Sequence, residues 1–408
     1  MASEALARTP PRQAPSAIQW LRENLFNNWL NSLITIVVAL LIGQLAVNVV
    51  SWALTTPGWA SVTSNLKLFF VGSYPVDQLW RVEVGVWFIA LLLGLSAGIW
   101  RGTAMMLALA LGTLVVALMV VLPFLDPSGL DYDIPPLLFL LGTAVLLALG
   151  YPVGHRFDDS LRLPVVVLWL LSFPLLWYLF TGAGAVLPRV PTNLWGGFLV
   201  TMSLTVVGIV ASFPLGVLLA LGRRSELPVV KIFSTIYIEV VRGVPLITFF
   251  FMGQLMLPLF LPGEIRVDNL VRAMVAVTLF SAAYLAENVR GGLQSIPRGQ
   301  IEAAHALGLN YVQTTLLITL PQALRAVIPA LVGQFISLFK DTSLVSIVGL
   351  LDLIGIAAAV RAQPQWLGLP GGVWREVLFF VAVIYFIFSF AMSRVSLRIE
   401  TNLGVGER

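Results

Sequence analysis

The composition of this 408-residue chain excludes most classes of soluble protein. Hydrophobic residues make up 58% of it and charged residues only 11%, less than half of the roughly 25% that is typical of a soluble domain. Cysteine is absent and only two histidines, His155 and His305, occur, so disulfide scaffolds, iron–sulfur clusters and most zinc sites lack ligands. The net charge of +4 comes from scattered basic residues, which indicates a membrane topology bias rather than nucleic-acid binding. We therefore predict an all-α, polytopic membrane protein in contact with lipid, with no metal site.

Long gaps between charged residues predict five membrane spans in the first half of the chain. A helix crosses the hydrocarbon with about 20 apolar residues, and a charge at its centre costs roughly 2.5 to 3.5 kcal/mol on insertion scales. The apolar cores between charges are residues 31–54, 84–100, 104–125, 135–152 and 164–181. The first core is longer than that of a signal peptide and lacks a clear small-x-small cleavage site, so we expect an uncleaved anchor.

Two segments beside these spans are expected to stay outside the hydrocarbon. Residues 1–30 are predicted to form a cytoplasmic tail. Residues 55–80 are too polar and too broken by Pro and Gly to predict a crossing, although they leave room for an interfacial helix around residues 66–70.

The second half predicts five further spans, about ten in all, at residues 196–221, 243–261, 271–290, 324–345 and 374–395. Ten crossings put both termini on the same side of the membrane. With the termini in the cytoplasm, most of the Lys and Arg residues lie in cytoplasmic segments, as the positive-inside rule requires.

One long cytoplasmic loop, residues 291–325, has a pattern of its own. Pro297 and Gly299 open a short helix predicted at residues 300–307, and its alanines permit close approach by another surface. Gly308 is expected to stop this helix. A second helical stretch at residues 311–320 is expected to end at Pro321. A helix–turn–helix between spans suits insertion into a groove on a soluble partner.

The same loop resembles the EAA signature of permease subunits of bacterial ABC importers. In that family the loop is the coupling helix that docks on the ATPase subunit. The resemblance assigns a role in ATPase coupling to Glu302, Ala303, Ala304, Gly308, Ile318, Leu320 and Pro321.

Further segments resemble the polar amino acid branch of these importers, and most closely the general L-amino acid importers of Gram-negative bacteria. The matching segments are residues 237–246, 283–292 and 340–344. The resemblance implies a five-helix core of the type I importer fold at residues 191–408, with a coupling loop at 297–321. Residues 31–190 would then be an N-terminal extension of about five spans. The implied location is the bacterial inner membrane, with both termini cytoplasmic.

The chain carries no ATP-binding loop of its own. A Walker A loop needs Gly-Lys-Ser/Thr, and none of the three lysines, Lys67, Lys231 and Lys340, follows a glycine. We therefore expect a transport subunit without catalytic residues or cofactors, with ATP and magnesium bound by a separate ATPase. A second permease, either another copy or a homologue, should complete the translocation path. The resemblance implies a heterodimer of two permeases with two ATPase copies and a periplasmic amino acid-binding protein.

Charges within the predicted spans are concentrated in the second half, where a functional role is the default reading. Lys340 and Asp341 could meet the two charges of a zwitterionic amino acid; alternatively, Lys340 snorkels at the external interface and Asp341 caps the following helix. Glu287 suits an ion pair with Arg290 on the same helical face better than substrate contact, and Glu239 repeats that spacing with Arg242. The candidates for the substrate pathway are Lys340, Asp341, Thr342, Ser343, Ser281, Tyr284 and Glu287.

Three functions compete at this stage. The favoured one is a permease that alternates between outward-facing and inward-facing states as a partner ATPase closes. An ion-coupled secondary amino acid transporter with Glu287, Asp341 or Asp352 as relay would predict inverted repeats, which the sequence lacks. A membrane enzyme would need paired catalytic side chains at one membrane depth, and none are found.

Overall fold

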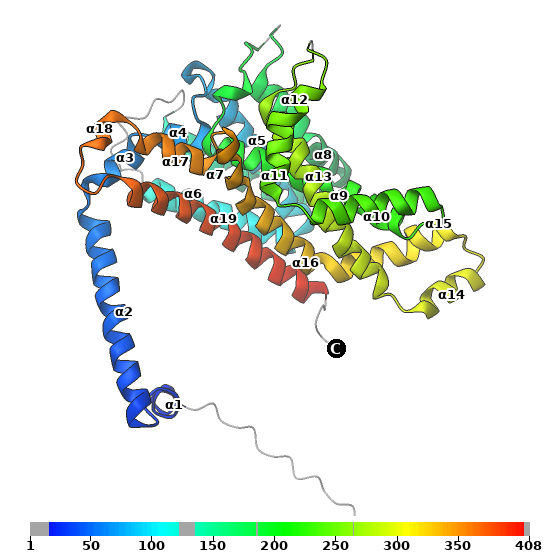
Figure 1. Cartoon of the computed structure of the whole chain (residues 1–408), viewed down its shortest axis with the longest axis horizontal. Helices are drawn as coiled ribbons and strands as arrows, with labels where there is room; N and C mark the ends of the chain where they lie inside the picture. The colour runs from blue at the N-terminus through cyan, green and yellow to red at the C-terminus, as the bar shows by residue number, and fades with distance from the viewer. Residues whose placement is uncertain (1–15, 122–134, 185–186, 264, 404–408) are drawn as a thin grey trace, which may run out of the picture. The chain divides into compact units, whose positions relative to one another are not determined.

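The computed structural model describes residues 16–121, 135–184, 187–263 and 265–403, and these are helical apart from turns and two isolated β-bridges. The chain divides into two units, residues 1–57 and residues 58–408 (Figure 1). The first half of the predicted tail therefore lies outside the described residues, as do the last residues of the third predicted span.

The first unit contains one membrane-length helix. α1 (Ala17–Asn24) is followed by α2 (Trp29–Thr55), which begins at Asn28, whose side chain accepts the Asn31 N–H at 2.8 Å. None of the residues of α2 is buried. A helix of this apolarity with no buried side chain is stable only against lipid or another apolar surface.

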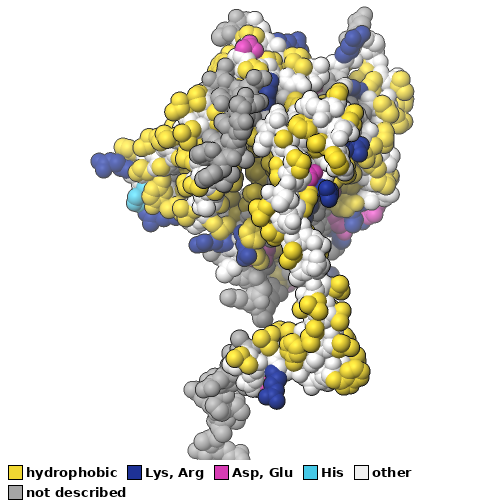
Figure 2. Space-filling view, turned by 90° about the vertical axis from the view of Figure 1, so that its left-hand side faces the viewer, with side chains coloured by type: hydrophobic (Ala, Val, Ile, Leu, Met, Phe, Trp, Pro, Cys, Tyr) yellow, Lys and Arg dark blue, Asp and Glu magenta, His cyan; other side chains and the backbone are white. Residues whose placement is uncertain are grey.

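The second unit holds eight more long apolar helices, in agreement with the predicted spans. They are α5 (Trp80–Trp100), α6 (Gly102–Val121), α7 (Pro136–Arg156), α8 (Asp158–Thr181), α9 (Gly197–Arg223), α13 (Asn269–Gln294), α16 (Leu320–Asp341) and α19 (Trp374–Leu403). Within the described ranges nine helices can cross a membrane, or ten if one bent pair counts as a span. Hydrophobic side chains cover broad areas of this unit in Figure 2, as expected of a surface that faces lipid.

The bent pair replaces the straight helix expected at residues 243–261. α10 (Pro228–Arg242) meets α11 (Leu246–Phe251), η6 (Met252–Met256) and α12 (Leu257–Phe260) at an angle of 105°. Pro245 stands at the bend, where its missing N–H and the restriction on the preceding residue stop a continuous helix. The apolar part after the bend is therefore shorter than predicted.

Helices α5 and α7 cross at backbone contact. A Cβ added at Gly98 would lie 2.6 Å from His155 N, and one added at Gly150 would lie 2.8 Å from Leu95 N. Gly94 and Gly154 complete a small-xxx-small pattern on each helix. Such patterns let membrane helices approach closely enough for extensive van der Waals contact.

Short helices connect these spans. The segment before α5 contains η1 (Pro57–Trp59), α3 (Ala60–Thr63), α4 (Leu66–Val71) and η2 (Val76–Gln78), and η5 (Thr192–Leu194) precedes α9. Later come α14 (Arg298–Ala306), α15 (Tyr311–Gln313), η7 (Thr314–Thr319), η8 (Thr342–Val348), α17 (Leu353–Arg361) and α18 (Pro364–Leu367).

The interfacial helix expected around residues 66–70 is present as α4, but it packs against protein. Phe69 is fully buried, with its ring 5.0 Å from that of Phe380 in α19. Asn65 and Gln363 exchange side-chain hydrogen bonds of 3.2 and 2.8 Å. Because packing runs across residue 191, the domain boundary expected there stays a prediction.

Candidate coupling site and substrate pathway

The predicted coupling helix is present as α14, which has one buried and one exposed face. It begins at Arg298, two residues before the predicted start, and Pro297 precedes it. Ala304 is only 3% exposed, whereas Glu302 and Ala303 are exposed. The alanine that packs inward holds the helix on the protein, and the other two residues remain accessible to a partner.

Gly308 ends the coupling helix, as predicted, through a Schellman motif. Its N–H donates to His305 O at 2.9 Å, and the N–H of Leu309 donates to Ala304 O at 3.1 Å. These two bonds satisfy carbonyls at the end of the helix, and the motif requires a left-handed conformation at the residue just after the helix, which is Gly308. Gly308 has φ +80°, and nothing lies within 4 Å of the position of a Cβ. Backbone conformation, not lack of space, therefore favours glycine here.

The second half of the loop differs from the prediction. Asn310 and Gln313 form a reciprocal capping box, with bonds of 2.9 and 3.0 Å. From there the chain runs through α15 and η7 into α16 without interruption. The predicted end at Pro321 was wrong because Pro321 directly follows the π-turn η7 and lies in the first turn of α16, where a missing N–H is tolerated. Ile318, Leu320 and Pro321 thus lie where the coupling loop enters the membrane span.

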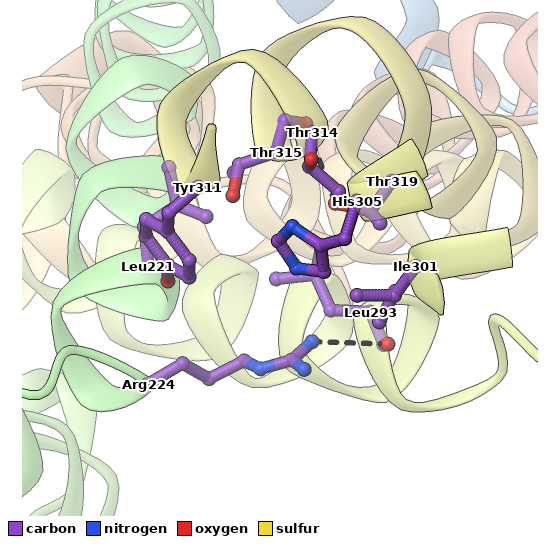
Figure 3. Close-up of a pocket in the computed structure, with 9 residues that line it drawn as sticks. All are labelled: Leu221, Arg224, Leu293, Ile301, His305, Tyr311, Thr314, Thr315 and Thr319. Carbon is purple, nitrogen blue, oxygen red and sulfur yellow. Dashed lines mark hydrogen bonds between the residues drawn. The ribbon is translucent and has the colours of Figure 1, made fainter. Parts of the chain in front are cut away.

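A small pocket of about 50 Å³ lies at the root of this loop (Figure 3). In Figure 3 the ring of His305 stands between Thr314 and Thr315 on one side and the guanidinium of Arg224 on the other. Arg224 donates to Leu293 O at 3.0 Å, which ties the end of α9 to α13. The lining residues are Leu221, Arg224, Leu293, Ile301, His305, Tyr311, Thr314, Thr315 and Thr319.

Glu287 is the centre of an ion-pair network. The predicted pair with Arg290 is present, with Nε 2.9 Å from the carboxylate. Arg223 of α9 and Arg242 of α10 approach the same carboxylate at 3.3 and 3.7 Å. Glu239 pairs with Arg223 at 2.7 Å rather than with Arg242. The network joins α9, α10 and α13, which favours a structural role for Glu287.

The pathway candidates fall into two places. Tyr284 joins the network because the Arg242 guanidinium lies 5.6 Å from its ring centroid. Ser281 is buried one turn earlier on α13, and its carbonyl accepts Gln334 Nε2 of α16 at 2.9 Å. The other four candidates stand where α16 ends and η8 begins. Because a 22-residue helix is about 33 Å long, they lie a membrane thickness from the coupling loop. Figure 1 likewise shows α14 and α15 at the opposite end of this unit from α17 and α18.

Lys340 and Asp341 lie in different environments at the end of α16. Lys340 is exposed and Asp341 is half-buried, and among the described residues no ion pair joins them. Asp341 precedes η8 but its side chain makes no capping hydrogen bond, so the capping alternative was wrong. Thr342 is fully buried and donates to Phe339 O at 2.7 Å, and Ser343 is half-buried.

Asp352 has a structural explanation that the sequence reading missed. Its carboxylate accepts the N–H groups of Gly355 and Ile354 at 2.9 and 3.2 Å. It therefore caps the start of α17. An aspartate directly before an apolar helical run is the signal that could have identified it.

These features define the class of the protein. The apolar helices, and the EAA-type loop that continues into a membrane span, are those of a membrane-spanning permease subunit of an ABC importer. The family described as "Binding-protein-dependent transport system inner membrane component" matches residues 212–401.

Curated relatives narrow the class further. The chain is 38% identical to the "Inner membrane amino-acid ABC transporter permease protein YhdY" of Escherichia coli strain K12, over 99% of both chains. It is 40% identical to the "Glutamate/glutamine/aspartate/asparagine transport system permease protein BztC" of Rhodobacter capsulatus, over 96% of both. The "Probable glutamine ABC transporter permease protein GlnP" of Bacillus subtilis is 36% identical and covers 51% of this chain with 93% of its own length. The chain belongs to the amino-acid ABC importer permeases and is a multi-pass inner membrane protein.

Proposed function

We propose that this chain moves L-amino acids across the bacterial inner membrane by alternating access, driven by a separate ATPase that docks on the coupling loop. The observation that carries the proposal is the geometry of α14. The exposed Glu302 and Ala303 lie on a helix that Gly308 ends in a defined turn, and from Tyr311 onward the chain runs as continuous helix into α16. Motion of an ATPase docked on α14 would therefore be transmitted through this segment to α16. Both termini would lie in the cytoplasm.

The chain would act within a larger complex. It offers one coupling loop, so two ATPase copies would need a second, homologous permease with a loop of its own. ATP and magnesium would bind to the ATPases, and no cofactor to this chain. A periplasmic binding protein would deliver the amino acid, consistent with the family description. A substrate range of L-amino acids is supported by relatives named for amino-acid transport.

The substrate pathway would begin near the external end of α16. Lys340, Asp341, Thr342 and Ser343 lie there, and the exposed Lys340 and half-buried Asp341 are not paired with each other. Two opposite charges without a mutual ion pair can contact the carboxylate and ammonium of an amino acid separately. Ser281 and Tyr284 would line the path further along α13.

The test is amino acid uptake by proteoliposomes that contain the chain with its co-purifying subunits. Wild type should take up labelled amino acid only with ATP and should hydrolyse ATP faster with binding protein and substrate present. Gly308→Asp, which adds a charge at the end of the coupling helix, should lose both activities. Uptake that persists without ATP and follows a proton or sodium gradient would instead establish a secondary transporter.

A further inference from the structure

The coupling loop joins α16 through a π-helix. η7 spans Thr314–Thr319, and the N–H that follows it, on Leu320, donates to Thr315 O, five residues back. An α-helix would bond four residues back, so this turn holds one residue more than an α-turn. Single π-turns inside α-helices are rare and are frequently found at functional sites.

Pro321 and Gln322, which follow the π-turn, disfavour α-helical winding of this segment. Pro321 has no N–H, so the carbonyl of Leu317 has no α-helical donor. Gln322 then places its side-chain amide 2.9 Å from Ile318 O, the carbonyl that its own backbone N–H would bond in an α-helix. Thr319 Oγ1 lies 3.3 Å from Thr315 O and donates to the same carbonyl as Leu320 N–H. Side-chain donors thus add to the backbone hydrogen bonds around this turn.

The turn also has room beside it. Thr314 and Thr319 are 3% and 6% exposed and line the small pocket shown in Figure 3. The buried hydroxyl of Thr314 has no hydrogen-bond partner among the described residues. On the other side Leu316 and Leu317 are exposed. A change in the winding of the turn therefore meets a pocket on one side and open surface on the other.

We propose that Thr314–Thr319 is a hinge that changes between π and α winding during transport, and that Pro321 and Gln322 position it. This inference rests on the proposed function, because the docked ATPase supplies the differential contact that shifts the equilibrium. A change of one residue in winding turns the coupling segment by about 100° and moves it by about 1.5 Å along α16. The Ile-x-Leu-Pro end of the EAA signature then specifies the hinge. The Glu-Ala-Ala end forms the face that docks on the ATPase.

The test measures the hinge directly. Because the chain contains no cysteine, spin labels can be placed at Val312→Cys and Ala326→Cys, both exposed and on either side of the turn. Distances between the labels are measured in the full complex, without nucleotide and with nucleotide trapped. Wild type should show two distance populations whose ratio changes with nucleotide.

Two variants should remove the change. Pro321→Ala restores the missing N–H, and Gln322→Leu removes the side-chain donor to Ile318 O, so each should leave one distance in both nucleotide states. Uptake per ATP should fall by about fivefold to tenfold with normal complex assembly. Pro136→Ala is the matched control, since Pro136 opens α7 without a π-turn, and it should behave as wild type.

The outcomes separate the hinge from the proposed function. One unchanged distance in wild type, together with ATP-driven uptake, would overturn the hinge and leave the function intact. Two distances retained in Pro321→Ala and Gln322→Leu would likewise refute the role of these residues. Absence of ATP-driven uptake in wild type would overturn the proposed function, and the hinge with it.

Discussion

Gly308 offers a test in which only backbone conformation changes. Its φ is +80° and no atom lies within 4 Å of a Cβ placed there, so alanine adds no clash. The left-handed conformation costs a non-glycine residue roughly 1 to 2 kcal/mol, and asparagine less. That energy corresponds to about a 5- to 30-fold change in the population of the turn.

We therefore expect a graded series in reconstituted complexes. Coupled uptake should fall little in Gly308→Asn, more in Gly308→Ala and most in Gly308→Val, because β-branched residues tolerate positive φ least. Gly299→Ala is the matched control, since Gly299 lies in the same loop with open space and no positive φ. ATP-dependent uptake and ATPase activity are measured on the same preparations. Equal activities of Gly308→Ala and Gly299→Ala would refute the argument that the left-handed turn positions the coupling helix.

Two further substitutions test the packing and the ion-pair network. Gly98→Ala should destabilise the complex in detergent by about 1 to 3 kcal/mol, because α5 and α7 must separate to admit a methyl group. Gly112→Ala is the control and should melt as wild type does, because its Cβ would lie 3.4 Å from the flexible side chain of Leu147. Equal melting temperatures of the two variants would contradict the close crossing. Glu287→Gln should lower the free energy of unfolding by about 1 to 3 kcal/mol, because three arginines lose their shared carboxylate. This range allows for solvent screening of the ion pairs, since the Glu287 side chain is 23% exposed. Lost uptake at unchanged stability would instead place Glu287 in the substrate pathway.

The features that the sequence predicted are local. The spans follow from apolar runs, and the stop at Gly308 from a single residue that tolerates positive φ. The Glu287–Arg290 pair follows from a spacing of three on one helix. In each case the determining residues are neighbours in the chain.

The features that it did not predict depend on residues far apart or on competing local rules. Arg223 reaches Glu287 across 64 positions, so the network around Glu287 is fixed by how α9, α10 and α13 pack. Phe69 packs against Phe380 for the same reason, and α4, which was expected to be an interfacial helix, is therefore part of the core. At Pro321 two rules conflict, since proline ends one helix but can open the next, and the structure accommodates both with a π-turn.

Cross-linking from the coupling helix to the ATPase tests the central claim most directly. Single cysteines at Ala303, which is exposed, and at Ala304, which is buried, are introduced into the cysteine-free chain within the purified complex. A short thiol-reactive photo-cross-linker at Ala303→Cys should join this chain to the ATPase subunit, and the same reagent should give little product at Ala304→Cys. No product with the ATPase from Ala303→Cys, in a complex that still shows ATP-driven uptake, would contradict docking through this face of the loop.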